Sequence, residues 1–532
     1  MSQKISSTRS GDDTFEGLSV EERKRMTKRV LWKFDCYILP PLALLWLANF
    51  IDRTNVGNAR IAGLQTDTHL VGNQFNIALA VFYILYILSE LPSNWVLKRM
   101  GANRWLPFLI CIWGTVTTLS GLVQNFAGLT AVRMILGMCE GGLLPGMILY
   151  LSTIYRRHEL QLRVGIFYAS ASLSGAFGGL LASAIIRMDG IGGLAGWRWI
   201  FILEGIVTVL FGVMAAFVMP ASIQSANFLT PEEKRFALHR FRMSERTANS
   251  APLSEPSQRI TTTEKEEKDL EEVRAEVYDP NASNDREEPV VHQEEEQFEW
   301  REVVRGLVDV QAWLTGIAYF GIIVSIYSYS LFLPTIISEL GFSGGEAQLR
   351  TVPPYVPAAV LTVVVAYLSD RFKLRGPMIL ICLPLTIAGY IVAICATSNQ
   401  VRYAAVFMMA TGIYPTGPCI LSILPNNSSG HYKKATTIAL QLAFANTGGF
   451  VATFSYTQDQ APAYIRGHSI TLAFVVLAWI FVALNVTYCA WENKARADGR
   501  RQDNILKYQE LWDSGKTRAP IGDRHPDFRF TL

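Results

Sequence analysis

Long hydrophobic stretches separated by shorter polar segments make up most of this 532-residue sequence. A helix needs about 20 apolar residues to cross a lipid bilayer, and twelve stretches are close to that length or longer. They fall into two groups of six, which cover residues 36–56, 76–97, 105–124, 129–154, 164–187 and 199–219, and then 310–334, 353–370, 377–397, 402–425, 435–456 and 468–491. This pattern predicts an all-α membrane protein with twelve transmembrane helices in two six-helix bundles.

The polar segments complete the predicted layout. A tail (1–35) precedes the first bundle (36–220), a linker (221–305) joins it to the second bundle (306–491), and a second tail (492–532) follows. Between Glu264 and Glu299 the linker carries fifteen acidic and four basic residues, and such a segment has too little apolar surface to fold alone. We therefore expect an acidic, partly disordered linker, with one helix starting near Thr230-Pro231-Glu232-Glu233.

Basic residues in the short loops predict the orientation of the chain, because Lys and Arg accumulate on the cytoplasmic side of a membrane. The even-numbered connections carry most of them: Lys98, Arg99, Arg104, Arg156, Arg157, Arg163, Arg371, Lys373, Arg375, Lys433 and Lys434. The odd-numbered connections carry fewer: Arg60, Arg187, Arg350, Arg402 and Arg466. Both tails and the linker are therefore expected in the cytoplasm. No apolar signal-peptide core precedes about Tyr37, so the first span is expected to direct membrane insertion.

The composition excludes several classes of protein. With 50% hydrophobic and 17% charged residues, the chain lacks the charged surface of a soluble protein. The seven cysteines are scattered through or beside apolar stretches, without the spacing of a metal site or of a disulfide framework. We find no glycine-rich phosphate loop and no nucleophile–histidine arrangement. An enzyme, a bound cofactor or metal, and a nucleic-acid partner are therefore not expected.

Two charges interrupt the fourth apolar stretch, residues 129–154. Arg133 and Glu140 are seven residues apart and share one helix face, roughly 10 Å apart along the axis. Gly137 and Gly141 lie on nearly the same face and allow another helix or a ligand to approach closely. A charge that faces lipid costs a few kcal/mol or more at the bilayer centre, so both must face protein or water. The pair is either a structural link between helices or a polar centre for an ionic substrate or a proton.

Further polar residues lie in other spans. Asp52 and Arg53, late in the first span, are either interfacial charges that reach the outer headgroups or a protonatable carboxylate with an arginine partner. Tyr86 in the second span either packs as an aromatic ring or holds a polar group of a substrate. Asn446 in the eleventh span either joins two helices through a hydrogen bond or donates to a substrate. Tyr327 in the seventh span belongs to a segment that could close the outer mouth.

The loop between the eighth and ninth spans carries Asp370-Arg371, with Ala366 four positions earlier. It resembles the conserved cytoplasmic loop motif of the major facilitator superfamily, Gly-x-x-x-Asp-Arg-x-Gly-Arg. The matching loop of the first half is degenerate, with Lys98 in place of the aspartate. This resemblance implies the major facilitator fold, in which two six-helix bundles surround a central cavity and work by alternating access.

Within that superfamily the chain is similar to the anion:cation symporters, and most similar to the fungal allantoate permease branch. The similarity spans about residues 30–230 and 300–495. It is carried by Asp52-Arg53-Thr-Asn55-Val-Gly57-Asn58-Ala59, Glu90-Leu-Pro92-Ser93-Asn94, Arg133-x-x-x-Gly137-x-x-Glu140-Gly141 and Gly196-Trp197-Arg198-Trp199-Ile-Phe201-x-x-Glu204-Gly205. The branch includes carriers of nicotinate, allantoate, pantothenate and biotin, mostly proton-coupled.

The resemblance implies roles for the polar residues, because matching residues of bacterial organic-acid symporters handle the proton and the anion. Asp52 and Glu140 are expected to carry the proton, and Arg53 and Arg133 to bind the substrate. A guanidinium forms a planar fork that fits a carboxylate. A substrate that occupies the arginine deprives a neighbouring carboxylate of its counter-charge, so substrate and proton favour each other's binding.

These observations predict a proton-coupled secondary transporter that imports a small organic anion, such as a nicotinate-like vitamin, across the plasma membrane of a fungus. Tyr86 and Asn446 are expected to orient the substrate, and the protein is expected to be a monomer. Two alternatives stay open. One is a transporter-like sensor that signals through its acidic linker, and the other is a proton-coupled drug antiporter.

Overall fold

The computed structural model describes residues 19–249, 299–342, 344–519 and 521–532. The long helices of the first half are α2 (Val20–Ala59), α4 (Gln74–Met100), α5 (Ala102–Ser120), α6 (Phe126–Glu140) continued by α7 (Leu143–Ser152), α8 (Arg157–Ile185) and α9 (Gly196–Val218). Those of the second half are α13 (Val310–Glu339), α15 (Val352–Phe372), α16 (Gly376–Cys395), α17 (Asn399–Ile413) continued by α18 (Thr416–Asn427), α19 (His431–Asn446) continued by α20 (Gly448–Ser455), and α21 (Ile465–Ala497).

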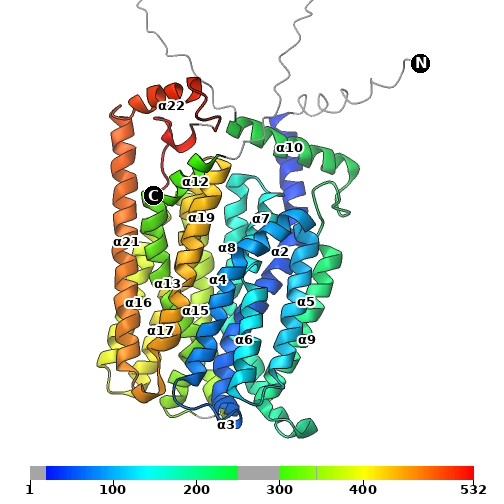
Figure 1. Cartoon of the computed structure of the whole chain (residues 1–532), viewed down its shortest axis with the longest axis vertical. Helices are drawn as coiled ribbons and strands as arrows, with labels where there is room; N and C mark the ends of the chain where they lie inside the picture. Colours follow the sequence, from blue (N-terminus) through cyan, green and yellow to red (C-terminus); the bar gives the residue numbers. More distant parts are fainter. Residues whose placement is uncertain (1–18, 250–298, 343, 520) are drawn as a thin grey trace, which may run out of the picture.

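These helices run side by side along one common direction (Figure 1). Among the described residues, nine helical segments are long and apolar enough to cross a membrane, and α4, α5 and α8 run beside them. The arrangement confirms the predicted all-α membrane protein with twelve transmembrane helices in two six-helix bundles. The part of the acidic linker that we expect to be disordered lies outside the described residues, apart from Glu299.

The two ends of the bundle differ. At one end lie α10 (Pro231–Asn249), α12 (Trp300–Leu307) and α22 (Asp503–Asp513), and we call this end the tail face (Figure 1). At the other end lie the π-helix η1 (Arg60–Leu64), α3 (Gln65–Asp67) and α14 (Gly344–Arg350), and we call it the loop face. α10 begins at Pro231, within the sequence that predicted a helix start.

α2 begins earlier than its apolar stretch. Its first residue is Val20, whereas the apolar stretch begins near residue 36. The Ser19 hydroxyl accepts a hydrogen bond from the Glu22 backbone N–H at 3.2 Å, and the Glu22 carboxylate accepts one from the Ser19 N–H at 3.1 Å. This reciprocal capping satisfies backbone donors of the first turn, so α2 extends beyond the membrane at the tail face.

Segments outside the membrane pack against the half that is nearest in sequence. On α10, Glu233 accepts two hydrogen bonds from Lys33 of α2, at 2.9 and 2.7 Å. Burial opposes the charge of Glu233, but the hydrogen bond from Lys33 and the nearby cations hold its pKa below the usual range. In the C-terminal segment, Asp523 binds Lys433, and it binds Arg305 at 3.2 Å. Parts of the predicted linker and tail are therefore docked on the bundle.

The two halves contact each other closely at the loop face. The side-chain amide of Asn76 on α4 donates hydrogen bonds to the backbone oxygens of Thr453 and Tyr456. Gly57 of α2 packs against the backbone oxygen of Leu331 on α13, and a Cβ atom at that position would collide with it. Glycine therefore permits the close approach of α2 and α13 that closes this face.

Candidate functional site

Three polar side chains of α2 form the base of a buried cluster at the middle of the first half. Asp52 and Arg53 lie three and four residues after Asn49, so each of them is a neighbour of Asn49 on the helix surface. Their exposed fractions are only 1%, 1% and 5%. The alternative in which Asp52 and Arg53 reach the outer headgroups is therefore wrong, because both side chains are enclosed by protein.

Two ion pairs connect α2 to α6 in this cluster. Arg53 Nη2 lies 3.5 Å from Glu140 Oε2, and Arg133 Nη1 lies 3.9 Å from Asp52 Oδ2. Asn49 donates a hydrogen bond of 2.7 Å to Glu140 Oε2. The expectation that Arg53 is the partner of Asp52 is thus corrected. Consecutive side chains of a helix point in directions about 100° apart, so each of the two finds a partner on α6 instead.

The cluster is incompletely satisfied. Both ion pairs are longer than a normal N–H···O hydrogen bond. Buried atoms of Asn49, Asp52, Arg53 and Glu140 have no hydrogen-bond partner among the described residues: Oδ1, Oδ2, Nε and Nη2, and Oε1, respectively. Buried polar atoms are almost always paired, so these open positions mark a place where a polar ligand, water or a proton can bind.

Aromatic rings surround the guanidinium of Arg53. Its Cζ lies 4.9 Å from the ring centroid of Tyr327, 5.3 Å from that of Phe50, 5.4 Å from that of Tyr86 and 5.8 Å from that of Phe82. Arg53 Nη1 also donates a hydrogen bond of 2.6 Å to the Tyr327 hydroxyl. Each cation–π contact of a desolvated arginine contributes up to about 2 kcal/mol, so the rings favour a charged Arg53 away from bulk water.

The second half reaches this cluster through Tyr327 and Asn446. The Tyr327 hydroxyl donates to Asn446 Oδ1 over 3.5 Å, and Asn446 Nδ2 donates to Glu90 Oε2 over 3.5 Å. The six residues singled out in the sequence therefore lie in one connected group. Arg53, Arg133, Asp52 and Glu140 form its charged centre, the Tyr86 ring flanks Arg53, and Asn446 joins it through Tyr327.

Two glycines bring α4 against α6 beside the charges. A Cβ atom at Gly137 would collide with the backbone oxygen of Phe82, and one at Gly141 with that of Tyr86. The close approach expected at these glycines is therefore made by a helix. This contact sets the Phe82 and Tyr86 rings next to Arg53.

Sequence reasoning missed Asn49 and gave Tyr327 a different role. Asn49 lies one turn before Arg53 in an apolar stretch, and this spacing was a usable signal. Tyr327 was assigned only to closure of the outer mouth, because its partner Arg53 is 274 residues away in the sequence. Glu204 of α9 accepts a hydrogen bond of 2.8 Å from Asn55 and interacts electrostatically with Asp52, Arg133 and Glu140, so it adjoins the charged cluster.

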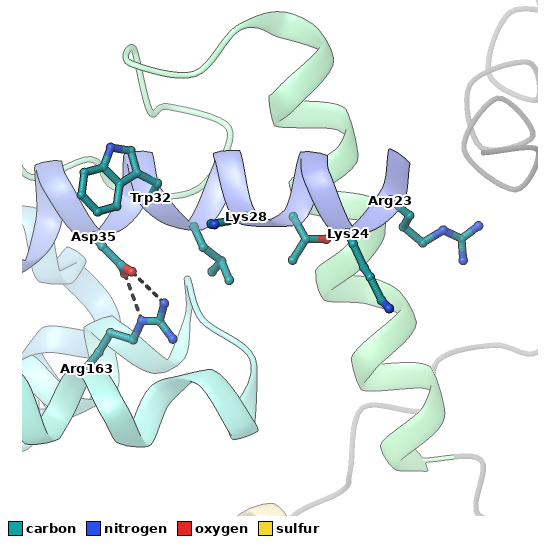
Figure 2. A pocket seen from close by; sticks show the side chains of 8 residues that line it. Arg23, Lys24, Lys28, Trp32, Asp35 and Arg163 are labelled. Atoms are coloured by element: carbon teal, nitrogen blue, oxygen red, sulfur yellow. Dashed lines mark hydrogen bonds and ion pairs between the residues drawn. The ribbon is translucent and has the colours of Figure 1, made fainter. Parts of the chain in front are cut away.

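A separate cavity of about 500 Å³ lies on the tail face. Its lining includes Lys24, Lys28 and Trp32 of α2, with Arg163 of α8 bound to Asp35 at 3.0 and 2.7 Å (Figure 2). Asp35 and Asp52 are about 25 Å apart along α2 at about 1.5 Å per residue. The cavity is therefore remote from the charged cluster, and it belongs to the basic end of the protein.

Comparison with known proteins identifies the family. The model of the Major Facilitator Superfamily matches residues 42–484, and the chain belongs to that superfamily. An uncharacterized transporter of Schizosaccharomyces pombe is 34% identical over 527 residues, which are 98% of this chain and 95% of the relative. The high-affinity nicotinic acid transporter of Saccharomyces cerevisiae is 30% identical over 505 residues, which are 95% of this chain and 85% of the relative.

Solved structures show the same fold. A D-xylose-proton symporter superposes with a TM-score of 0.59 at 16% identity, over 84% of this chain and 97% of the symporter. A bacterial homolog of the human lysosomal transporter Spinster superposes with a TM-score of 0.58 at 16% identity, over 85% of this chain and 97% of that protein. The protein is a multi-pass membrane transporter and not an enzyme.

Proposed function

We propose that this transporter imports a small organic anion together with protons, and that the anion binds at Arg53. The proposal rests on the burial of the Arg53 side chain and on its hydrogen bonds. Arg53 is buried, its Nη1 is bound to Tyr327, and its Nη2 and Nε lack hydrogen-bond partners among the described residues. A guanidinium with free donors in a dry site is suited to a carboxylate. Arg133, paired at 3.9 Å with Asp52, supplies a second positive charge.

Proton coupling follows from the composition of the cluster. Asp52 and Glu140 already neutralise Arg53 and Arg133 when both carboxylates are ionised and no substrate is bound. Glu204 interacts electrostatically with Asp52, Arg133 and Glu140, so this space holds no surplus of positive charge. An anionic substrate adds one negative charge in a space where unpaired charge costs several kcal/mol. Protonation of Glu140 or Asp52 restores the balance. Substrate and proton then bind with positive cooperativity, which symport requires.

The surroundings of Arg53 favour a planar, nicotinate-like monocarboxylate. Four aromatic rings lie within 6 Å of the guanidinium, and rings of this kind stack with a flat substrate. Tyr86 and Asn446 would orient the ring and its polar atoms. The relative from Saccharomyces cerevisiae is named a nicotinic acid transporter, and this supports the substrate class. It also fits the proposed place of the chain in the allantoate permease branch of the anion:cation symporters.

We place the tail face in the cytoplasm and the protein in a fungal plasma membrane, as a monomer. The basic cavity at α2 supports the orientation, because Lys24, Lys28 and Arg163 lie at this face. Contacts such as that of Asn76 with Thr453 close the loop face, and with the tail face in the cytoplasm we infer a state closed to the outside. Alternating access would exchange these contacts for others at the tail face.

Uptake measurements test the proposal. Labelled nicotinate, pantothenate, biotin and allantoate are supplied to fungal cells that lack their own carriers, at pH 5 and pH 7, with and without an uncoupler. The expected result is saturable uptake of a monocarboxylate that is faster at pH 5 and abolished by the uncoupler. Uptake that is indifferent to pH and uncoupler would refute proton coupling. A specific acid that binds the purified protein without being taken up would favour the sensor alternative instead.

A further inference from the structure

Glu90 is a third buried carboxylate, outside the two ion pairs. It lies on α4 one turn beyond Tyr86, toward the tail face, and only 6% of the residue is exposed. Its described partner is the amide of Asn446, which donates to Oε2 over 3.5 Å. Among the described side chains, no arginine or lysine forms an ion pair with it. An ionisable group without a compensating charge is energetically costly inside a membrane protein. Such a residue is therefore a candidate for a function.

A directed chain of hydrogen bonds connects Glu90 to the anion site. Arg53 donates to the Tyr327 hydroxyl at 2.6 Å. Tyr327 donates to Asn446 Oδ1 and Asn446 Nδ2 donates to Glu90, and both of these hydrogen bonds are long, at 3.5 Å. A guanidinium can only donate and an ionised carboxylate can only accept. The two ends therefore fix the direction of every bond between them.

The neighbours of Glu90 leave this chain as its main polar connection. On its own helix, Tyr86 stands between Glu90 and the group of Arg53, Glu140 and Tyr327, and interacts electrostatically with all of them. Helices α5 and α7 meet α4 nearer the tail face, around Ser93. On the side of the second half, α20 presents Gly449 and Phe450 to the Tyr83 ring, and α19 presents Asn446 to Glu90.

We propose that Glu90 is a second proton-binding site, and that Tyr327 and Asn446 report to it whether Arg53 is occupied by substrate. The inference rests on the proposed function, since it concerns the same anion site. A substrate carboxylate that takes the donors of Arg53 releases the Tyr327 hydroxyl. Without the bond from Arg53, the Tyr327 hydroxyl is a weaker donor to Asn446, and the Asn446 amide is a weaker donor to Glu90. Ionised Glu90 is then less stabilised, and its carboxylate accepts one proton from water in the transport pathway.

Protonation of Glu90 acts back on the chain. The neutral acid can donate, which allows the Asn446 amide to turn its oxygen toward Glu90 and its NH2 group toward Tyr327. The Tyr327 hydroxyl then accepts from Asn446 in place of Arg53, so it no longer competes with the substrate for the guanidinium. Asn446 and Tyr327 belong to the second half, whereas Glu90 and Arg53 belong to the first. Movement of the halves therefore separates Glu90 from its partner, and the proton passes to water on the tail face.

The test compares Glu90→Gln with Glu346→Gln in proteoliposomes. Glu346 is the control, because it is an exposed carboxylate of α14 at the loop face, where it pairs with Arg350 at 3.3 Å outside the charged cluster. Two readouts are needed for labelled nicotinate: exchange across the membrane at equal pH, and accumulation driven by a pH gradient. We expect Glu90→Gln to keep exchange within about threefold while losing about tenfold of gradient-driven accumulation, within the range of a coupling of 1–3 kcal/mol. Glu346→Gln should keep both.

Each outcome decides the inference. Exchange in Glu90→Gln also shows that the variant is folded and binds substrate, so loss of accumulation alone supports a proton site. If the wild type accumulates substrate in response to the pH gradient and Glu90→Gln accumulates as much, this inference is overturned and the proposed function is left intact. Equal loss in Glu346→Gln overturns it as well, because the effect would not be specific to Glu90. A wild type without pH-driven accumulation overturns the proposed function and this inference together.

Discussion

Arg53 on α2 donates a hydrogen bond of 2.6 Å to the hydroxyl of Tyr327 on α13, and this bond joins the two halves at the charged cluster. The same guanidinium lies 3.5 Å from Glu140 and keeps donors free. In the proposed mechanism an anion competes with Tyr327 for Arg53. Occupancy of the site is thereby linked to the contact between the halves, which is the link that alternating access needs.

Replacing Tyr327 by Phe tests this competition. The ring stays, but the hydroxyl that occupies Arg53 Nη1 is lost. A hydrogen bond to a charged group contributes about 1.5–3 kcal/mol. Without the hydroxyl, Arg53 Nη1 has no hydrogen bond to give up when the anion binds, so the anion should bind about tenfold more tightly. Equilibrium binding of labelled nicotinate to purified protein measures the change. Weaker binding would show that the Tyr327 hydroxyl contacts the anion rather than competing with it.

Replacing Arg53 by Lys separates charge from geometry. Lysine keeps the positive charge but cannot present a planar fork to a carboxylate. We expect affinity for the anion to fall by about a hundredfold, since loss of a bidentate charge-assisted pair costs about 2–3 kcal/mol. Arg60→Lys is the matched control, because Arg60 also lies over an aromatic ring, that of Phe75 at 4.6 Å, but at the loop face outside the cluster. Unchanged affinity in Arg53→Lys would move the anion site to Arg133.

Replacing Glu140 by Gln tests the first proton site. The amide has nearly the same shape and can still bind Asn49, but it cannot take up a proton. We expect exchange of substrate to continue while gradient-driven accumulation falls to the level of passive equilibration. The comparison of exchange with accumulation in proteoliposomes measures both. Full accumulation in Glu140→Gln would move the first proton site from Glu140 to Asp52.

Replacing Gly57 by Ala tests the contact that closes the loop face. The added methyl group would collide with the backbone oxygen of Leu331, so the halves cannot pack as they do here. We expect the state open at the loop face to become dominant, and a cysteine introduced at buried Thr453 to react faster with a membrane-impermeant thiol reagent. Gly316→Ala is the control, because a Cβ there lies 3.9 Å from its nearest neighbours. Equal reactivity in both variants would contradict the expectation.

Acidification should release α10 from α2. The pKa of Glu233 is held below its usual value, so its bonds with Lys33 stabilise the docked helix above the pKa of an unbound carboxyl group. That contribution is lost as pH falls through the lowered pKa of Glu233. Hydrogen exchange of α10 measured from pH 7 down to pH 3 should accelerate toward the acid end. In Glu233→Gln the exchange should be fast throughout, and an unchanged profile would exclude a role of Glu233 in docking.

The sequence predicted the elements better than the partners of each side chain. Transmembrane spans can be predicted from the sequence because a helix that crosses a bilayer needs an apolar stretch of about 20 residues. A charged residue such as Arg133 is easily recognised inside such a stretch. The pairing of Arg133 with Asp52 depends on how α2 and α6 are rotated about their axes, which a sequence pattern does not contain. The bond of Arg53 to Tyr327 joins residues 274 positions apart, so it required the packing of the two halves. The docking of α10 followed only partly from its predicted start at Pro231.

The most direct test of the account is the proton movement that accompanies the substrate. Purified protein is reconstituted with a pH-sensitive dye inside proteoliposomes whose membrane potential is clamped, and nicotinate is added outside at equal pH. The account predicts internal acidification above that of protein-free liposomes, and none above this background in Glu140→Gln. Substrate entry through the wild-type protein without any change of internal pH would contradict it.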